Sequence, residues 1–213
     1  MTVPRLFLAA ILLQAFAAPL TAADLSVQIK GADGKPVRDA VVAVHLVGAA
    51  TPLPRSGGSY AIDQQNIQFH PFVTVVPVGA KVSFLNHDSV RHQVYSFSPA
   101  KRFELRLEQR QQDRVVTFDK PGVVPLGCNI HDRMIAFIDV VDTPWAIKTD
   151  ANGMAIMRGL PAGQVSVDVW HPYMRAAGNH AARQMTLTEG APNHAELVTP
   201  LRAPPQPPAQ SDY

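Results

Sequence analysis

Short apolar runs with polar residues at alternate positions recur along the chain, and glycine, proline, asparagine and aspartate separate them. Alternation with a period of two places every second side chain on one face of an extended strand. The strand candidates are residues 25–30, 37–47, 72–76, 81–85, 90–97, 103–107, 114–118 and 135–141. Residues 104–112 come nearest to a helical period, but the alternation of Phe103, Leu105 and Leu107 favours a strand. The pattern therefore predicts an all-β chain.

A change of pattern near Pro144 predicts more than one β unit. Beyond it, strand-like residues 155–157 and 165–170 alternate with turn sequences, of which Asn152-Gly153 suits a tight turn. The predicted units are N-terminal strands (24–60), a larger sandwich (61–142), a smaller β unit (143–199) and a proline-rich, disordered tail (200–213). Two arrangements stay open. Both chain ends form one small sandwich into which the larger unit is inserted, or two domains follow each other in tandem.

Residues 1–23 have the pattern of a secretory signal peptide. Arg5 is the only charge before Asp24, residues 6–18 are apolar except for Gln14, and small residues precede Asp24. The apolar run is short for a membrane span, and no later run is long enough. We therefore expect a periplasmic protein with no membrane span in its mature chain; an uncleaved N-terminal anchor is the alternative.

Charge and motifs narrow the classes of function. The chain has 19 Lys and Arg against 17 Asp and Glu, and the basic residues are scattered. Scattered basic residues argue against nucleic acid as a partner. The sequence contains neither a phosphate-binding glycine loop nor a serine nucleophile motif. The chain is therefore not expected to be an enzyme.

Cys128 is the only cysteine. Export favours disulfides, yet one cysteine cannot form one within the chain. Such a thiol is buried and inert, joined to another molecule, or held by a metal ion. His131 and Met134 follow Cys128 at intervals of three residues. Thiolate, imidazole and a weak thioether are ligands that copper takes in electron-transfer sites, so the loop predicts a copper site.

A copper site of this kind needs a second histidine, and two lie upstream. His92 stands in a strand-like context before Val94, whereas His87 lies in the turn-like sequence Asn86-His87-Asp88. His92 is the preferred ligand and His87 the alternative. Residues His45, His70 and His171 are assigned structural roles.

The ligand loop and its surroundings resemble the plastocyanin-like cupredoxins, and more closely the exported methylamine-utilisation-like cupredoxin-domain proteins. The resemblance covers residues 25–141 and is carried by residues 68–71, 78–88, 92–96 and 122–134. It implies a cupredoxin-like Greek-key β-sandwich. It also implies one copper ion, cycling between Cu(I) and Cu(II), with His92, Cys128 and His131 as ligands and Met134 in the axial position. Asn86 would tie the two ligand-bearing loops together by hydrogen bonds, or is a plain turn residue.

The loop departs from the family pattern in one respect. Only two residues separate His131 from Met134, fewer than plastocyanin-like loops usually have. The same short spacing occurs in binuclear copper loops, but these need a second cysteine. Whether Met134 is an axial ligand or packs beneath the copper stays open.

The chain ends resemble a second family. Residues 149–169 and 27–44 are similar to the carboxypeptidase-regulatory or transthyretin-like sandwich, a structural or adhesive module. The resulting hypothesis is an exported one-electron carrier between redox protein partners. The alternatives are a copper-binding module for delivery or sensing, and a non-catalytic structural or carbohydrate-contacting sandwich.

Overall fold

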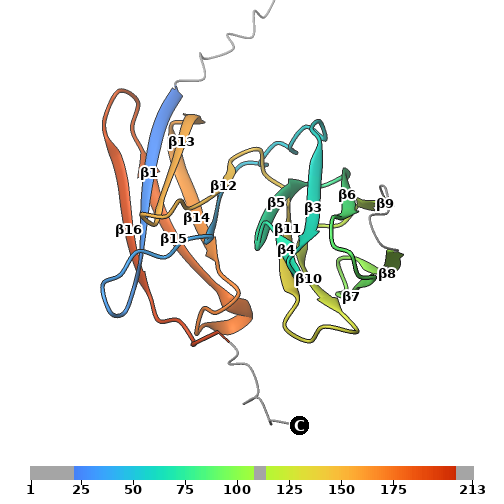
Figure 1. The fold of residues 1–213 in the computed structure, drawn as a ribbon. Helices are drawn as coiled ribbons and strands as arrows, with labels where there is room; N and C mark the ends of the chain where they lie inside the picture. Colours follow the sequence, from blue (N-terminus) through green and yellow to red (C-terminus); the bar gives the residue numbers. More distant parts are fainter. Residues whose placement is uncertain (1–21, 108–113, 205–213) are drawn as a thin grey trace, which may run out of the picture.

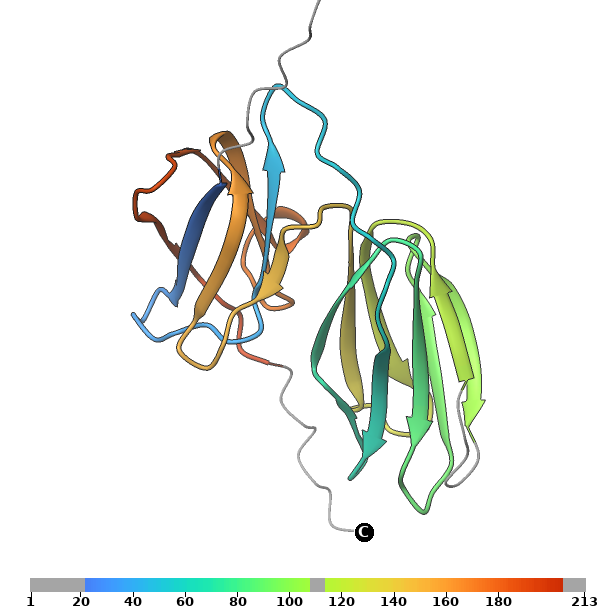
Figure 2. The same cartoon turned by 90° about the horizontal axis from the view of Figure 1, so that it is seen from above.

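The computed structural model describes residues 22–107 and 114–204, which form two β-sandwiches packed side by side (Figures 1 and 2). Strands predominate, and one short 3₁₀ turn spans Ala177–Asn179. The predicted all-β fold, with a larger and a smaller sandwich, is confirmed. Residues 1–21, which hold most of the predicted signal peptide, and residues 205–213 of the predicted tail lie outside the described part. No helix among the described residues is long and apolar enough to cross a membrane.

The smaller sandwich consists of a three-stranded sheet in the order β13-β1-β16 and a four-stranded sheet in the order β12-β2-β14-β15. Its strands are β1 (Ala22–Gly31), β2 (Val41–Leu46), β12 (Ala146–Lys148), β13 (Met154–Pro161), β14 (Gly163–Trp170), β15 (His180–Leu187) and β16 (Asn193–Thr199). β1 pairs antiparallel with β13 and parallel with β16. β2 pairs with β12 and β14. Both sheets of this sandwich therefore combine strands from the two ends of the chain.

The larger sandwich contains the strands that lie between β2 and β12 in the sequence. Its sheets have the orders β5-β11-β10-β7-β8 and β4-β3-β6-β9. The strands are β3 (Tyr60–Gln65), β4 (Gln68–His70), β5 (Val73–Pro77), β6 (Ala80–Asn86), β7 (His92–Phe97), β8 (Arg102–Leu107), β9 (Arg114–Phe118), β10 (Gly122–Cys128) and β11 (Ile135–Val141). Residues 104–107, from the segment that came nearest to a helical period, lie in strand β8, and residues 108–112 of that segment lie outside the described part.

Alternation of side chains accounts for the two cores. In β1 every second residue from Ala23 to Gly31 is buried, as a period of two requires when one face of a sheet is covered. β6 alternates in the same way, and its Phe84 is fully buried between the sheets of the larger sandwich. Each sandwich therefore has its own apolar core.

The two sandwiches also pack against each other. Trp170 of β14 and Phe137 of β11 meet with ring centroids 5.6 Å apart, and Val41 of β2 and Val73 of β5 are buried in the same cluster. Lys148 of β12 donates a hydrogen bond to the Val73 carbonyl at 2.8 Å. Apolar contact and a hydrogen bond therefore join the two units.

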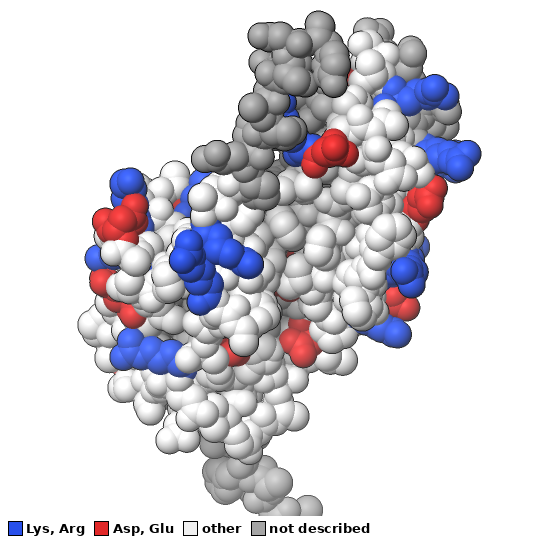
Figure 3. All heavy atoms as spheres, turned by 90° about the horizontal axis from the view of Figure 1, so that it is seen from below, with Lys and Arg blue, Asp and Glu red and all other residues white. Residues whose placement is uncertain are grey.

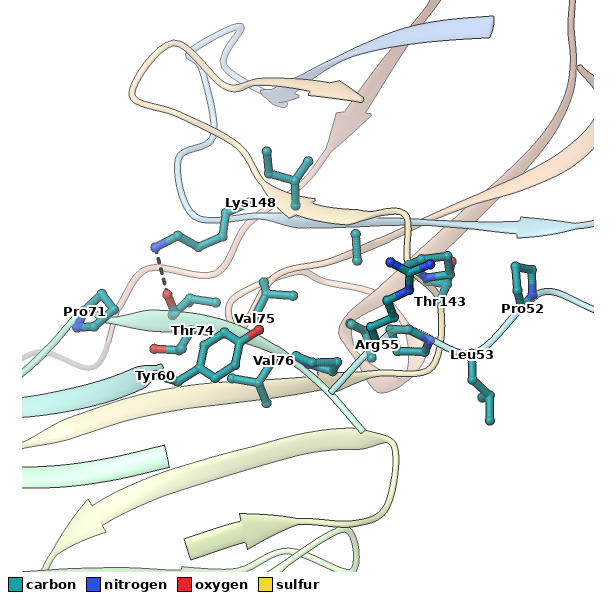
Figure 4. Close-up of a pocket in the computed structure, with 17 residues that line it drawn as sticks. Pro52, Leu53, Arg55, Tyr60, Pro71, Thr74, Val75, Val76, Thr143 and Lys148 are labelled. Atoms are coloured by element: carbon teal, nitrogen blue, oxygen red, sulfur yellow. Dashed lines mark hydrogen bonds between the residues drawn. The ribbon is translucent and has the colours of Figure 1, made fainter. Parts of the chain in front are cut away.

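A groove of about 790 Å³ runs along this junction (Figure 4). β5 and β12, each at the edge of its sheet, line it together with residues 52–55 of the loop that links β2 to β3. Thr74 of β5 is buried at the groove, and its hydroxyl has no hydrogen-bond partner among residues 22–107 and 114–204. Such a buried, unpaired hydroxyl costs free energy of folding.

Two local conformations explain where strands begin and turn. The predicted strand 37–47 starts only at Val41, because Asp39 has φ 61°, in the left-handed region that interrupts an extended strand. Asn152 and Gly153 form the predicted turn: Gly153 has φ 72°, and a Cβ there would lie 2.4 Å from the Ile29 carbonyl oxygen. Only glycine fits that turn without displacement.

Candidate metal centre

Three side chains that could bind a metal ion meet at one end of the larger sandwich. His92 is the first residue of β7 and Cys128 the last residue of β10. These strands are antiparallel neighbours, with Cys128 opposite Val94. His131 lies on the loop that joins β10 to β11. Sheet pairing therefore brings together two residues that are 36 positions apart.

The donor atoms surround the thiol at similar distances. The Sγ atom of Cys128 lies 3.9 Å from Nδ1 of His92 and 3.8 Å from Nδ1 of His131. The three donor atoms all lie within 4.8 Å of one another. Metal–sulfur and metal–imidazole bonds of about 2.3 and 2.05 Å, set at 120°, would separate sulfur from nitrogen by about 3.8 Å. The cluster thus fits one three-coordinate ion with a thiolate and two imidazoles.

Burial differs among these three residues. Cys128 and His92 are buried, whereas His131 is half-buried between exposed neighbours, Ile130 and Asp132. The rings of His92 and His131 are 5.1 Å apart between centroids. One ligand edge of the cluster is therefore accessible from solvent, and the thiol is not.

Met134 ends the loop. Its backbone N–H donates a hydrogen bond to the His131 carbonyl at 2.9 Å, which closes a turn. Its side chain is 1% exposed and belongs to the same core cluster as Cys128. The thioether is thus held on the buried side of the loop, and its role as an axial ligand stays a prediction.

Asp88 contacts this cluster and was not among the predicted site residues. Its Oδ2 lies 2.8 Å from Nε2 of His92, the ring nitrogen opposite the one that faces Cys128. Burial would raise the pKa of Asp88, but hydrogen bonds from His92 and from the backbone N–H groups of Ile67 and Asn66 outweigh it and lower the pKa. A sequence signal existed, because Asp88 is part of the phrase that precedes His92 in the family resemblance.

Asn86 organises the loop that leads to His92. Its Oδ1 accepts a hydrogen bond from the backbone N–H of Asp88 at 3.0 Å, and its Nδ2 donates to the Val90 carbonyl at 2.8 Å. The side chain is 2% exposed. These bonds lie within the 86–90 loop, and the predicted link to the Cys128 loop stays a prediction.

His87, the alternative ligand, takes a different direction. Its Nε2 lies 3.4 Å from Oδ1 of Asp63, and its side chain is half exposed. The metal-ligand group found among residues 22–107 and 114–204 contains His92 and not His87. The geometry therefore favours His92.

Two of the three histidines assigned structural roles have protein partners away from this cluster. His45 lies between two carboxylates, those of Asp142 and Asp168. His171 is buried, and its Nδ1 accepts a hydrogen bond from the backbone N–H of Tyr173 at 3.2 Å. Burial lowers the pKa of His171.

The surface charge is mixed. On the face in Figure 3, basic and acidic side chains alternate along both sides of the molecule, and an uncharged area lies between them. Among the described residues, the basic side chains on this face form no continuous patch.

Comparison with known proteins finds structures that resemble part of this chain. No known family model and no curated protein matches the sequence. Among solved structures, a purple cupredoxin from Nitrosopumilus maritimus is 22% identical, with 38% of this chain and 99% of that chain covered and a TM-score of 0.34. A variant of amicyanin in its reduced state is 18% identical over 48% and 99% of the two chains, with a TM-score of 0.36. A copper-containing nitrite reductase from Thermus scotoductus is 26% identical over 55% and 28%, with a TM-score of 0.37.

Proposed function

We propose that the protein binds one copper ion through His92, Cys128 and His131 and carries single electrons between redox protein partners. The observation that carries the proposal is the placement of two Nδ1 atoms, 3.8 and 3.9 Å from one thiol sulfur. Thiolate with two imidazoles suits both oxidation states of copper, and a bound ion would exchange one electron there. Met134, buried at the end of the same loop, is proposed as the weak axial ligand.

The protein's own residues support electron transfer in two ways. The buried Cys128 and His92 sit on paired strands, so their positions change little when an electron arrives or leaves. His131 is half-buried, so its exposed part offers a partner protein a contact with the site. A rigid site with one accessible ligand edge is what a carrier requires.

The test is a Cu(II) titration of the purified protein. We expect an intense visible thiolate-to-copper absorption that saturates at one copper per chain, and Cys128→Ser should abolish it. The matched pair His92→Ala and His87→Ala should separate the two upstream histidines, with only the first losing the colour. Protein that stays colourless and binds no stoichiometric copper would overturn the proposal. Stoichiometric copper without the absorption would favour delivery or sensing instead.

We also propose that the chain is exported to the periplasm after removal of residues 1–23, and that residues 61–142 form the copper unit. Cleavage there would keep Leu25, which is buried opposite Met157, and would remove Ala22 and Ala23 from the start of β1. Intact-mass measurement of protein recovered from the periplasm should give a chain that starts at Asp24. A full-length chain that stays in the membrane fraction would identify an uncleaved anchor.

A further inference from the structure

His92 uses its two ring nitrogens on opposite sides. Nδ1 lies 3.9 Å from the Cys128 sulfur, and Nε2 lies 2.8 Å from Oδ2 of Asp88. The His92 side chain is fully buried, so water cannot replace either contact. A carboxylate accepts hydrogen bonds and does not donate them. Nε2 therefore carries the proton, and the lone pair of Nδ1 faces the thiol.

Asp88 is itself fixed from the other side. Its Oδ1 accepts a hydrogen bond from the backbone N–H of Asn66 at 2.7 Å, and Oδ2 accepts one from Ile67 at 3.0 Å. Its own N–H donates to Asn86. With two backbone N–H donors and one ring nitrogen on its oxygens, the carboxylate has little freedom to turn away from His92.

The two N–H donors come from a strained turn. Asn66 and Ile67, which join β3 to β4, have φ angles of 56° and 57°. A β-branched residue such as isoleucine is rare in the left-handed region, and such strain persists only where surrounding contacts hold it. Asp88 provides those contacts. The strained turn and the ring of His92 thus share one carboxylate.

We propose that Asp88 is the positioning residue of the metal centre, fixing the tautomer and orientation of His92 and strengthening it as a donor. The inference rests on the proposed function. Carboxylates that accept the outer N–H of a metal-bound histidine have this role in other metal sites. A negative charge beside the ligand also favours the more positive oxidation state of the bound ion, so Asp88 would lower the reduction potential.

The first test needs no metal. Nitrogen-15 NMR of the metal-free protein should show His92 with a protonated Nε2 and an unprotonated Nδ1. Asp88→Asn should lose this single tautomer. A mixture of tautomers in the wild-type protein would overturn the positioning role. If the tautomer is as expected but no copper binds, the proposed function fails and the positioning of His92 stands.

The second test uses Cu(II) alone. Asp88→Asn should weaken Cu(II) binding 10- to 100-fold. A tenfold loss confined to Cu(II) corresponds to a rise of about 59 mV in the midpoint potential. The matched control is Asp63→Asn, whose carboxylate pairs with the half-exposed His87 instead of a ligand and should change the affinity less than twofold.

Weaker Cu(II) binding in Asp88→Asn could come from the lost carboxylate or from a disturbed turn at Asn66 and Ile67, and a further variant distinguishes the two. Glycine adopts a φ near 57° without strain, so Ile67→Gly should hold the turn when the Asp88 carboxylate is absent. The double variant Asp88→Asn/Ile67→Gly should therefore fold and still bind Cu(II) at least tenfold more weakly than Ile67→Gly alone. Equal affinity in these two proteins would overturn the proposal.

Discussion

The Nε2 atom of His45 lies 2.9 Å from Oδ1 of Asp142 and joins β2 of the smaller sandwich to the residue that follows β11 of the larger one. The opposite ring nitrogen, Nδ1, lies 3.0 Å from Oδ2 of Asp168 on β14. One imidazole therefore bridges two carboxylates at the junction of the two sandwiches.

This bridge predicts a pH-dependent stability. Burial alone would lower the pKa of His45, but hydrogen bonds and charge from Asp142 and Asp168 outweigh it and raise the pKa. A histidine whose pKa is raised by folding contributes its full stabilisation below about pH 6.5, the ordinary pKa. The contribution is lost as the pH rises through the pKa of the folded state. His45→Gln should therefore lose about 1 kcal/mol of unfolding free energy at pH 5.5 and less at pH 9. Urea unfolding at both pH values measures it, with the exposed His194→Gln as control; an equal loss at both would contradict the bridge.

Asp139 gives a second reason for the stability of the protein to fall as the pH rises. It is 7% exposed on β11, and burial, with the nearby charge of Asp142, raises its pKa to about 6. The folded state holds this proton more tightly than the unfolded chain, so stability falls as the pH rises from 4 towards 6. A rise of about two pKa units corresponds to about 3 kcal/mol. Asp139→Asn should be more stable than wild type by up to that amount at pH 7.5, and the two should converge near pH 4 in denaturant titrations.

The His-Cys-His cluster was largely predictable because Cys128 and His131 share one loop and their spacing is visible in the sequence. Its third member, His92, was preferred for its strand-like context and the family resemblance. Asp88 was not predicted as a partner of His92, because its contacts depend on the left-handed turn at Asn66 and Ile67. No periodic pattern in the sequence marks a contact between side chains that come from separate turns.

The fold was predictable at the level of strands but not of sheets. Alternation located many of the strands, since burial repeats every second residue. No predicted range covered β3, β15 or β16. It could not specify that β1 pairs in parallel with β16, at the far end of the chain, because many apolar strands would satisfy the same alternation. The late start of β2 at Val41 likewise depends on the backbone of Asp39.

Thr74 predicts a stabilising substitution. Its hydroxyl is buried at the inter-sandwich groove without a hydrogen-bond partner in the described part of the chain, and valine has nearly the same shape. Thr74→Val should raise the free energy of unfolding by about 1 kcal/mol. Thr143→Val is the matched control and should be destabilising, because that hydroxyl donates to the Val44 carbonyl at 2.6 Å. If both variants lose stability, the Thr74 hydroxyl has a partner in solution.

Met134→Leu tests the axial ligand. The side chain is buried and leucine nearly conserves its volume, so the free energy of unfolding should change by less than about 1.5 kcal/mol. A lost thioether ligand should nevertheless shift the visible spectrum and the midpoint potential of the copper-loaded protein. Met157→Leu, buried in the core of the smaller sandwich, should leave both unchanged. An unchanged spectrum and potential in Met134→Leu would assign the residue to packing alone.

Gly127 makes room for the aromatic ring beside the metal centre. A Cβ at this position would lie 2.7 Å from Cζ of Tyr95, the residue opposite Gly127 on β7. Because Cys128 follows directly, Gly127→Ala should displace either the ring or the thiol and destabilise the protein by about 1–3 kcal/mol.

Removing the ring distinguishes these possibilities. In a double-mutant cycle, Tyr95→Ala should relieve most of the cost of Gly127→Ala, because the colliding atoms are gone. Gly57→Ala, where a Cβ meets nothing within 4 Å, is the control for adding a methyl group in a loop. Unfolding free energies measure the cycle, and Cu(II) affinity reports the thiol. If the free-energy changes of the two substitutions are additive, Tyr95 does not restrict residue 127, and glycine is needed there only for its backbone conformation.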